Sequence, residues 1–277
     1  MHRIPDQLKP YPIGWKAKLG FLVPSHDSGY GSYEMRVMSP DGVIPLETRV
    51  PGRTVVTEEL RSMVDAAVEA AAMLAHAGPD VIDFIPTAPC FVMGVEEESA
   101  LIQAISERTG LPATAGGRSV ADALRFLGAR RIIMYTPYRE DIQEVTDRYF
   151  ADQGFEVLGS RSLRFEDPES INRVSPYEIL ADVVKLRRQH PEADGVFIVG
   201  GCFRTLEITQ QLEELIGIPV VGTQQANMFN CLRLCGVDDR LEGFGQLLAA
   251  SRIAAEAGTS AAQHQPRSTG TAATAAA

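Results

Sequence analysis

The 277-residue sequence contains few cysteines, few histidines and no cluster of basic residues. Its 36 acidic residues outnumber its 26 lysines and arginines, giving a net charge of −10, which argues against binding to nucleic acid or to an anionic membrane. An anionic small molecule stays compatible with this charge, because backbone amides and a few local donors can hold a carboxylate. The apolar fraction of 45% is typical of a globular protein with a sizeable core.

Long apolar segments are also absent. No run approaches the roughly 18–20 residues that a membrane span needs, and residues 1–15 lack the apolar centre of a signal peptide. The four cysteines, at positions 90, 202, 231 and 235, are too few for a disulfide scaffold. We therefore expect a cytoplasmic protein with reduced thiols.

Cofactor motifs are missing as well. The sequence has no glycine-rich dinucleotide fingerprint, no phosphate-binding P-loop and no metal-binding histidine motif. Cys231 and Cys235 are four residues apart on an expected helix with no histidine nearby, which favours core packing over a metal site. We expect neither a metal nor a cofactor.

Apolar strands alternate with helices along most of the chain. Strands are expected at 18–24, 44–51, 81–86, 130–137, 155–163, 195–200 and 218–223, and helices at 57–78, 97–110, 119–128, 139–153, 177–190, 205–216 and 225–235. This alternation predicts an α/β fold with parallel sheets. Ligands bind such sheets outside the carboxyl ends of the strands, so the candidate loops are 24–29, 86–92, 136–139, 200–205 and 222–226.

Two segments of the sequence read alike. TGLPATAGGRSVADALRFLGARR, at 109–131, matches IGIPVVGTQQANMFNCLRLCGVDDR, at 216–240, with an offset of 107–108 residues. Each follows an apolar strand that ends in a loop with one cysteine, Cys90 or Cys202. The repeat predicts two related α/β halves with one site between them. The tail at 257–277 is too poor in large apolar residues to pack, and we expect it to be disordered.

Cys202 is the first candidate for catalysis. It follows Gly200 and Gly201 between an expected strand and an expected helix, where glycines permit close backbone approach to a ligand and helix amides favour an anion. The same field would lower the pKa of the thiol from about 8.5 and favour the thiolate. The alternative is a tight turn around a buried cysteine.

Cys90 is the second candidate. It ends the segment Pro86 to Cys90, in which Thr87 offers a hydroxyl to a carboxylate and Ala88 lies beside it. Cys90 could equally be a hydrophobic residue packed under the loop.

Other strand ends carry polar candidates. Tyr138 could reach the interface between the halves or simply pack in the core. Ser25, His26 and Asp27 form either part of the site or a solvated turn, since three neighbours in sequence are weak support for a triad. Thr223 could donate to a ligand or cap a helix.

These segments together resemble a known family. The segments are LGFLVPSHDS, residues 81–94, residues 109–132, TPYREDI and CFRTLEITQQLEELIGIPVVGTQQA. Together they cover about residues 17–250 and resemble the maleate cis-trans isomerase and arylmalonate decarboxylase family, within the Asp/Glu racemase superfamily. The resemblance implies two flavodoxin-like domains, 17–117 plus 224–256 and 118–223, after an N-terminal lead at 1–16. It also implies chemistry without a cofactor, with a substrate carboxylate held by Thr87, Tyr138 and the amides of Gly200 and Gly201.

The cysteines depart from the family pattern. Isomerases and racemases of this family carry a cysteine after each of two strands, at positions that align with Pro86 and Gly200 of this sequence. Cys90 and Cys202 lie four and two residues later. The decarboxylases keep only the second cysteine, and isomerases tend to have Ser-Asn where this chain has Ser25 and His26.

Three functional hypotheses follow. The first is a cofactor-independent isomerase or racemase for a small carboxylate or dicarboxylate such as maleate, with Cys202 as the lead thiolate and Cys90 as its counterpart. The second is a decarboxylase of malonate-type acids, in which Cys202 protonates an enediolate. The third is a non-catalytic carboxylate-binding relative. The expected partner is a small carboxylate, without nucleic acid or membrane, and a homo-oligomer is left open.

Overall fold

The computed structural model describes residues 12–27, 29–52 and 54–250. The expected disordered tail, residues 1–11 of the lead and the last residues of the 224–256 segment lie outside these ranges. Within them, no helix is both long enough and apolar enough to cross a membrane.

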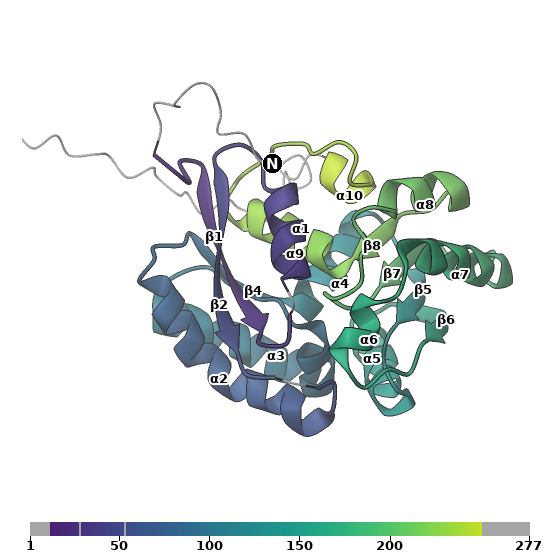
Figure 1. Cartoon of the computed structure of the whole chain (residues 1–277), viewed down its shortest axis with the longest axis horizontal. Coiled ribbons are helices and arrows are strands. Elements are labelled where there is room, and N and C mark those ends of the chain that lie inside the picture. The colour runs from purple at the N-terminus through teal and green to yellow at the C-terminus, as the bar shows by residue number, and fades with distance from the viewer. Residues whose placement is uncertain (1–11, 28, 53, 251–277) are drawn as a thin grey trace, which may run out of the picture.

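Two parallel sheets of four strands form the centre of the molecule (Figure 1). The strand order of the first is β2 (Val43–Val50), β1 (Ala17–Pro24), β3 (Val81–Phe84) and β4 (Ala113–Ala115). That of the second is β6 (Glu156–Ser162), β5 (Arg131–Thr136), β7 (Gly195–Ile198) and β8 (Val220–Gly222). Both sheets have the flavodoxin-like order, second, first, third, fourth. The predicted fold of two pseudo-symmetric α/β halves is confirmed.

Helices cover both sheets. They are α1 (Tyr30–Met38), α2 (Thr57–Ala75), α3 (Thr87–Thr109), α4 (Gly116–Phe126), α5 (Glu140–Asp152), α6 (Pro168–Asn172), α7 (Pro176–Gln189), α8 (Thr209–Ile216), α9 (Thr223–Leu234) and α10 (Gln246–Ala249). Helix α2 illustrates their origin: its buried residues Leu60, Met63, Ala67 and Leu74 recur at helical spacing, and Glu58 lies in its first turn.

The sequence repeat is a structural repeat. Strand β4 runs directly into α4, and β8 runs into α9 at an offset of 107 residues. The carbonyls of Pro112 and Pro219, before these strands, each accept a hydrogen bond from the neighbouring strand. Helices α4 and α9 pack against each other; α9 also contacts β1, β3 and β4, while α4 contacts β8. The matched helices therefore join the two halves, while the exact domain boundaries stay a prediction.

Some elements differ from expectation. Helix α3 begins at Thr87, ten residues earlier than predicted, because glycine and two prolines near its start read as a loop. Helix α8 begins at Thr209 and leaves an irregular segment after β7. Helices α1, α6 and α10 and strand β4 were not predicted; none of them is longer than nine residues.

Gly94 interrupts α3 and separates its first turns from the rest. Its backbone, at φ 78° and ψ 175°, lies in a region open essentially to glycine alone. We expect Gly94→Ala to lower the free energy of unfolding by about 1–3 kcal/mol, measured by denaturant titration. Gly217→Ala is the control, because its left-handed conformation at φ 71° and ψ 14° tolerates other residues better. A smaller loss at Gly94 than at Gly217 would contradict this account.

Candidate active site

A small cavity of about 70 Å³ lies at the carboxyl ends of strands from both sheets. Parallel strands of both halves end there, so residues far apart in sequence meet. Its walls are formed by Pro24, His26, Asp27, Val55, Leu60, Met63, Ile85, Pro86, Thr87, Ala88, Pro89, Pro137, Tyr138, Ile171, Gly200, Gly201, Cys202 and Gln224. Seven of the ten predicted site residues are in this wall.

Thr87 and Tyr138 form a polar pair in the cavity. The Thr87 Oγ1 and Tyr138 hydroxyl oxygens are 3.3 Å apart, and both side chains are buried. Burial raises the pKa of the Tyr138 phenol, which therefore stays protonated as a donor. Thr87 and Ala88 also begin α3, where backbone amides point outward from the helix. This end of the cavity suits a carboxylate.

The glycine segment after β7 makes a different contribution than expected. The Gly200 amide donates to Thr223 Oγ1 at 3.0 Å, so it is already occupied. The Gly201 carbonyl accepts from Gln224 Nε2 at 3.4 Å. Thr223 is buried at the start of α9 and is not part of the cavity wall. Thr223 and Gln224 thus fix the segment that carries Cys202.

Cys202 lines the cavity, but its electrostatics differ from the sequence-based expectation. Burial raises the pKa of its thiol to about 12, and the Asp27 carboxylate adds to this shift. The expected lowering is wrong because burial dominates, and because the helix expected directly after Cys202 begins only at Thr209, seven residues further on. Near neutral pH the group is a thiol, which is suited to donate a proton.

Cys90 does not reach the cavity wall. It is fully buried, and its Sγ donates to the Pro86 carbonyl at 3.1 Å. Burial and then the Glu98 carboxylate raise its pKa. The structure therefore brings one of the two candidate thiols to the cavity, and a catalytic role for Cys90 stays a prediction.

The residues of the loop after β1 lie partly in the cavity wall and partly on the surface. Asp27 and His26 line the cavity, whereas Ser25 is exposed, outside its wall, and donates to the Gly52 carbonyl at 2.7 Å. His26 Nδ1 lies 3.2 Å from the same carbonyl oxygen, and burial lowers the pKa of its ring.

The apolar wall was not predicted. This wall consists of Val55 from the segment before α2, Leu60 and Met63 from α2, and Ile171 from α6. The Val55 amide donates to the Glu166 carbonyl at 3.2 Å and ties the two halves together there. Leu60 and Met63 belong to the buried stripe of α2, and nothing in the sequence distinguishes a cavity-facing residue from a core residue on such a stripe.

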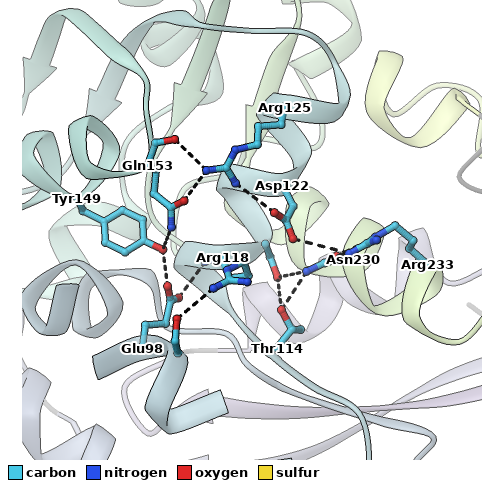
Figure 2. Close-up of polar contacts among 11 residues, drawn as sticks. Glu98, Thr114, Arg118, Asp122, Arg125, Tyr149, Gln153, Asn230 and Arg233 are labelled. Atoms are coloured by element: carbon cyan, nitrogen blue, oxygen red, sulfur yellow. Dashed lines mark hydrogen bonds and ion pairs between the residues drawn. The ribbon is translucent and has the colours of Figure 1, made fainter. Parts of the chain in front are cut away.

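A network of polar side chains joins helices of the two halves (Figure 2). Glu98 of α3 accepts hydrogen bonds from the Tyr149 hydroxyl of α5 and, at 2.9 Å, from the Arg118 amide of α4. Asn230 of α9 donates to Thr114 Oγ1 of β4 at 2.9 Å and to Ser119 Oγ of α4 at 3.2 Å. Four helices thus meet through bonded polar groups, which joins the two halves rigidly.

These features define a two-sheet α/β enzyme whose cavity, between two repeated halves, holds one thiol and a buried Thr–Tyr pair. The chain belongs to the arylmalonate decarboxylase family, whose sequence model matches residues 20–248. The family resemblance predicted from the sequence is confirmed.

Individual relatives agree with this assignment. Arylmalonate decarboxylase of Bordetella bronchiseptica is 29% identical over 195 residues, which cover 70% of this chain and 81% of the relative. Maleate isomerase of Geobacillus stearothermophilus is 24% identical over 84% of this chain and 97% of the relative.

Solved structures are also similar. A mutant arylmalonate decarboxylase in liganded form is 27% identical, with a TM-score of 0.77 over 84% of this chain and 98% of that one. A Nocardia farcinica maleate cis-trans isomerase mutant with a covalently bound succinylcysteine intermediate is 23% identical, with a TM-score of 0.78 over the same shares. The latter likeness concerns the fold alone.

Proposed function

We propose that the protein decarboxylates a malonate-type acid with an apolar substituent, using the Cys202 thiol as proton donor. The observation that carries this proposal is the protonated thiol of Cys202 in the cavity. Among the described residues that line the cavity, there is no second cysteine. Family membership supports it, because two relatives are named for decarboxylation of arylmalonates and isomerisation of maleate.

Thr87 and Tyr138 bind the carboxylate that is kept. The bond from the α-carbon to the other carboxylate breaks, CO2 leaves, and the electron pair remains on the substrate as an enediolate. The two hydroxyl groups donate to its oxygens, in a buried site where such bonds are strong. The Cys202 S–H bond then breaks, the proton moves to the α-carbon, and the thiolate regains a proton from water.

The apolar wall supports a substrate with an apolar substituent. Val55, Leu60, Met63 and Ile171 offer contact area to an aryl or alkyl group. No lysine or arginine is among the described residues of the wall, so a distant second carboxylate, as in maleate, would find no cation there. This favours malonate-type acids over longer dicarboxylates.

The isomerase hypothesis requires a reactive thiolate and a second thiol on the other side of the substrate. Covalent addition to a double bond needs a thiolate, and the raised pKa of Cys202 makes that form scarce near neutral pH. With Cys90 enclosed away from the wall, no second thiol faces the opposite side of a substrate. A cytoplasmic location and self-association stay predictions.

The test compares products. We expect purified protein to convert phenylmalonate to phenylacetate with loss of CO2, detected by mass spectrometry, and to leave maleate unchanged. Cys90→Ala is expected to keep the same product and at least a tenth of the turnover, since its sulfur is outside the cavity wall. Conversion of maleate to fumarate without mass change would favour the isomerase, and thermal stabilisation by both acids without turnover would favour a binding protein.

A further inference from the structure

The segment that carries Cys202 belongs to no helix or strand. Strand β7 ends at Ile198 and α8 begins at Thr209, so the residues between them are placed by their contacts with other elements. Within the second half, the fully buried ring of Phe203 packs against that of Tyr135, with 5.4 Å between the ring centroids. This contact anchors the middle of the segment in the core.

Glu34 reaches the same segment from the first half. It lies in α1, its side chain is 1% exposed, and its Oε1 accepts a hydrogen bond from the Leu206 amide at 3.0 Å. The two residues are 172 positions apart in the sequence. A buried amide that loses its acceptor is costly, so this bond fixes Leu206, which follows Cys202 closely in the sequence.

The first turn of α1 packs against a second support of the segment. An added Cβ at Gly31 would collide with Gln224 Nε2, and this nitrogen also donates to the Gly201 carbonyl at 3.4 Å. Helix α1 thus holds the segment on both sides of Cys202. It acts through Gln224 at Gly201 and directly at Leu206.

We propose that α1 of the first half positions Cys202 in the cavity, with Glu34 as the positioning residue. This inference rests on the proposed function, in which the thiol gives its proton to the α-carbon, because such a transfer depends on a fixed distance between donor and carbon. The first half then supplies both Thr87, which binds the carboxylate, and the contact that places the thiol relative to it.

Glu34→Met keeps a long side chain and removes the acceptor of the Leu206 amide. We expect the segment to loosen and water to reach Cys202, whose raised pKa is due mainly to burial. Alkylation of Cys202 by iodoacetamide at pH 7 should then be at least about 10-fold faster than in the wild-type protein, measured by mass spectrometry of the peptide that contains it. The kcat for phenylmalonate should fall by about 10- to 100-fold with little change in KM, because Thr87 and Tyr138 remain.

Two control variants separate position from stability. Glu34→Gln keeps an acceptor oxygen for the Leu206 amide, and its alkylation rate should stay within about 3-fold of the wild-type rate. Glu213 is also buried and accepts hydrogen bonds from the Val220 and Gln246 amides, but it is outside the cavity wall. Glu213→Met should lower stability in a urea titration and leave the alkylation of Cys202 unchanged.

Gly31→Ala tests the other contact of α1 without removing a buried carboxyl group. Its methyl group must displace the end of the Gln224 side chain, which holds Gly201. We expect alkylation of Cys202 to be at least about 3-fold faster in this variant, since a looser segment is less buried. This variant also carries the test if Glu34→Met does not fold.

Wild-type alkylation rates in folded Glu34→Met, or in Gly31→Ala where Glu34→Met does not fold, overturn the inference. An equal acceleration in Glu213→Met overturns it too, because the effect then follows stability. Faster alkylation in the α1 variants, together with no CO2 release from phenylmalonate by the wild-type protein, shows that the positioning holds and the proposed function does not. CO2 release with unchanged alkylation shows the reverse.

Discussion

Replacing Cys202 with alanine is expected to lower kcat of the decarboxylation by about 10²- to 10⁴-fold, the usual contribution of a positioned general acid. The thiol lines the cavity, and its raised pKa, about 12, keeps the proton on sulfur until the enediolate forms. KM should change little, because the groups proposed to bind the carboxylate, Thr87 and Tyr138, remain. The measurement is steady-state CO2 release from phenylmalonate by the wild-type protein and the variant.

Two further variants sharpen this result. Cys235→Ala makes the same change outside the cavity wall, at the end of α9, and should keep wild-type turnover. Cys202→Ser keeps the shape but offers a much weaker acid, and should fall near the alanine variant. Retention of more than a tenth of kcat by Cys202→Ala would remove the thiol from the mechanism.

The thiol's protonation state has its own readout. Because the thiolate fraction rises with pH up to the pKa, alkylation of Cys202 by iodoacetamide should be slow near pH 7 and speed up about tenfold per pH unit through pH 10. A rate already at its plateau at pH 7 would indicate the lowered pKa that the sequence suggested.

The fold was accessible from the sequence because it follows from local patterns. Apolar strands and amphipathic helices alternate, and the segments at 109–131 and 216–240 repeat, so the two sheets were predicted before any contact was known. The surroundings of Cys202 were not accessible in this way. Its pKa depends on burial and on Asp27, which is 175 positions away in the sequence.

The positions of Cys90 and Cys202 relative to the cavity also could not be predicted from the sequence. Both thiols follow strands in the sequence, yet the early start of α3 places Cys90 on a helix with its sulfur bonded to the Pro86 carbonyl. The apolar wall escaped prediction because Leu60 and Met63 repeat like core residues.

Asp83 provides the second large expected effect, which concerns stability. It is fully buried in β3, the strand that leads to Thr87. Burial raises the pKa of its carboxyl to about 8, although the Cys231 thiol, 3.6 Å away, donates to Oδ2 and opposes the shift. Its Oδ1 is buried without a hydrogen-bond partner among the described residues, a situation that penalises the charged form further.

The sign of the pH dependence follows from this shift. Below the unfolded pKa of 3.8 both states hold the proton, and the contribution of Asp83 to stability is complete. Between there and about pH 8 only the folded state keeps the proton, so the free energy of unfolding falls by about 1.4 kcal/mol per pH unit. Above the folded pKa both states are ionised, and no further loss occurs.

Asp83→Asn removes this titration while keeping the size of the side chain. We expect the variant to gain about 4 kcal/mol relative to the wild-type protein between pH 5 and pH 8, measured by urea titration at both values. Glu97→Gln is the control, because this exposed carboxylate pairs with exposed Arg61 on the surface and should change stability by less than about 1 kcal/mol. A stability difference between Asp83→Asn and the wild-type protein that is the same at both pH values would mean that Asp83 ionises normally in the core. In that case its charge would need a partner, and the strand carrying Thr87 would be anchored by an ionised rather than a neutral carboxyl group.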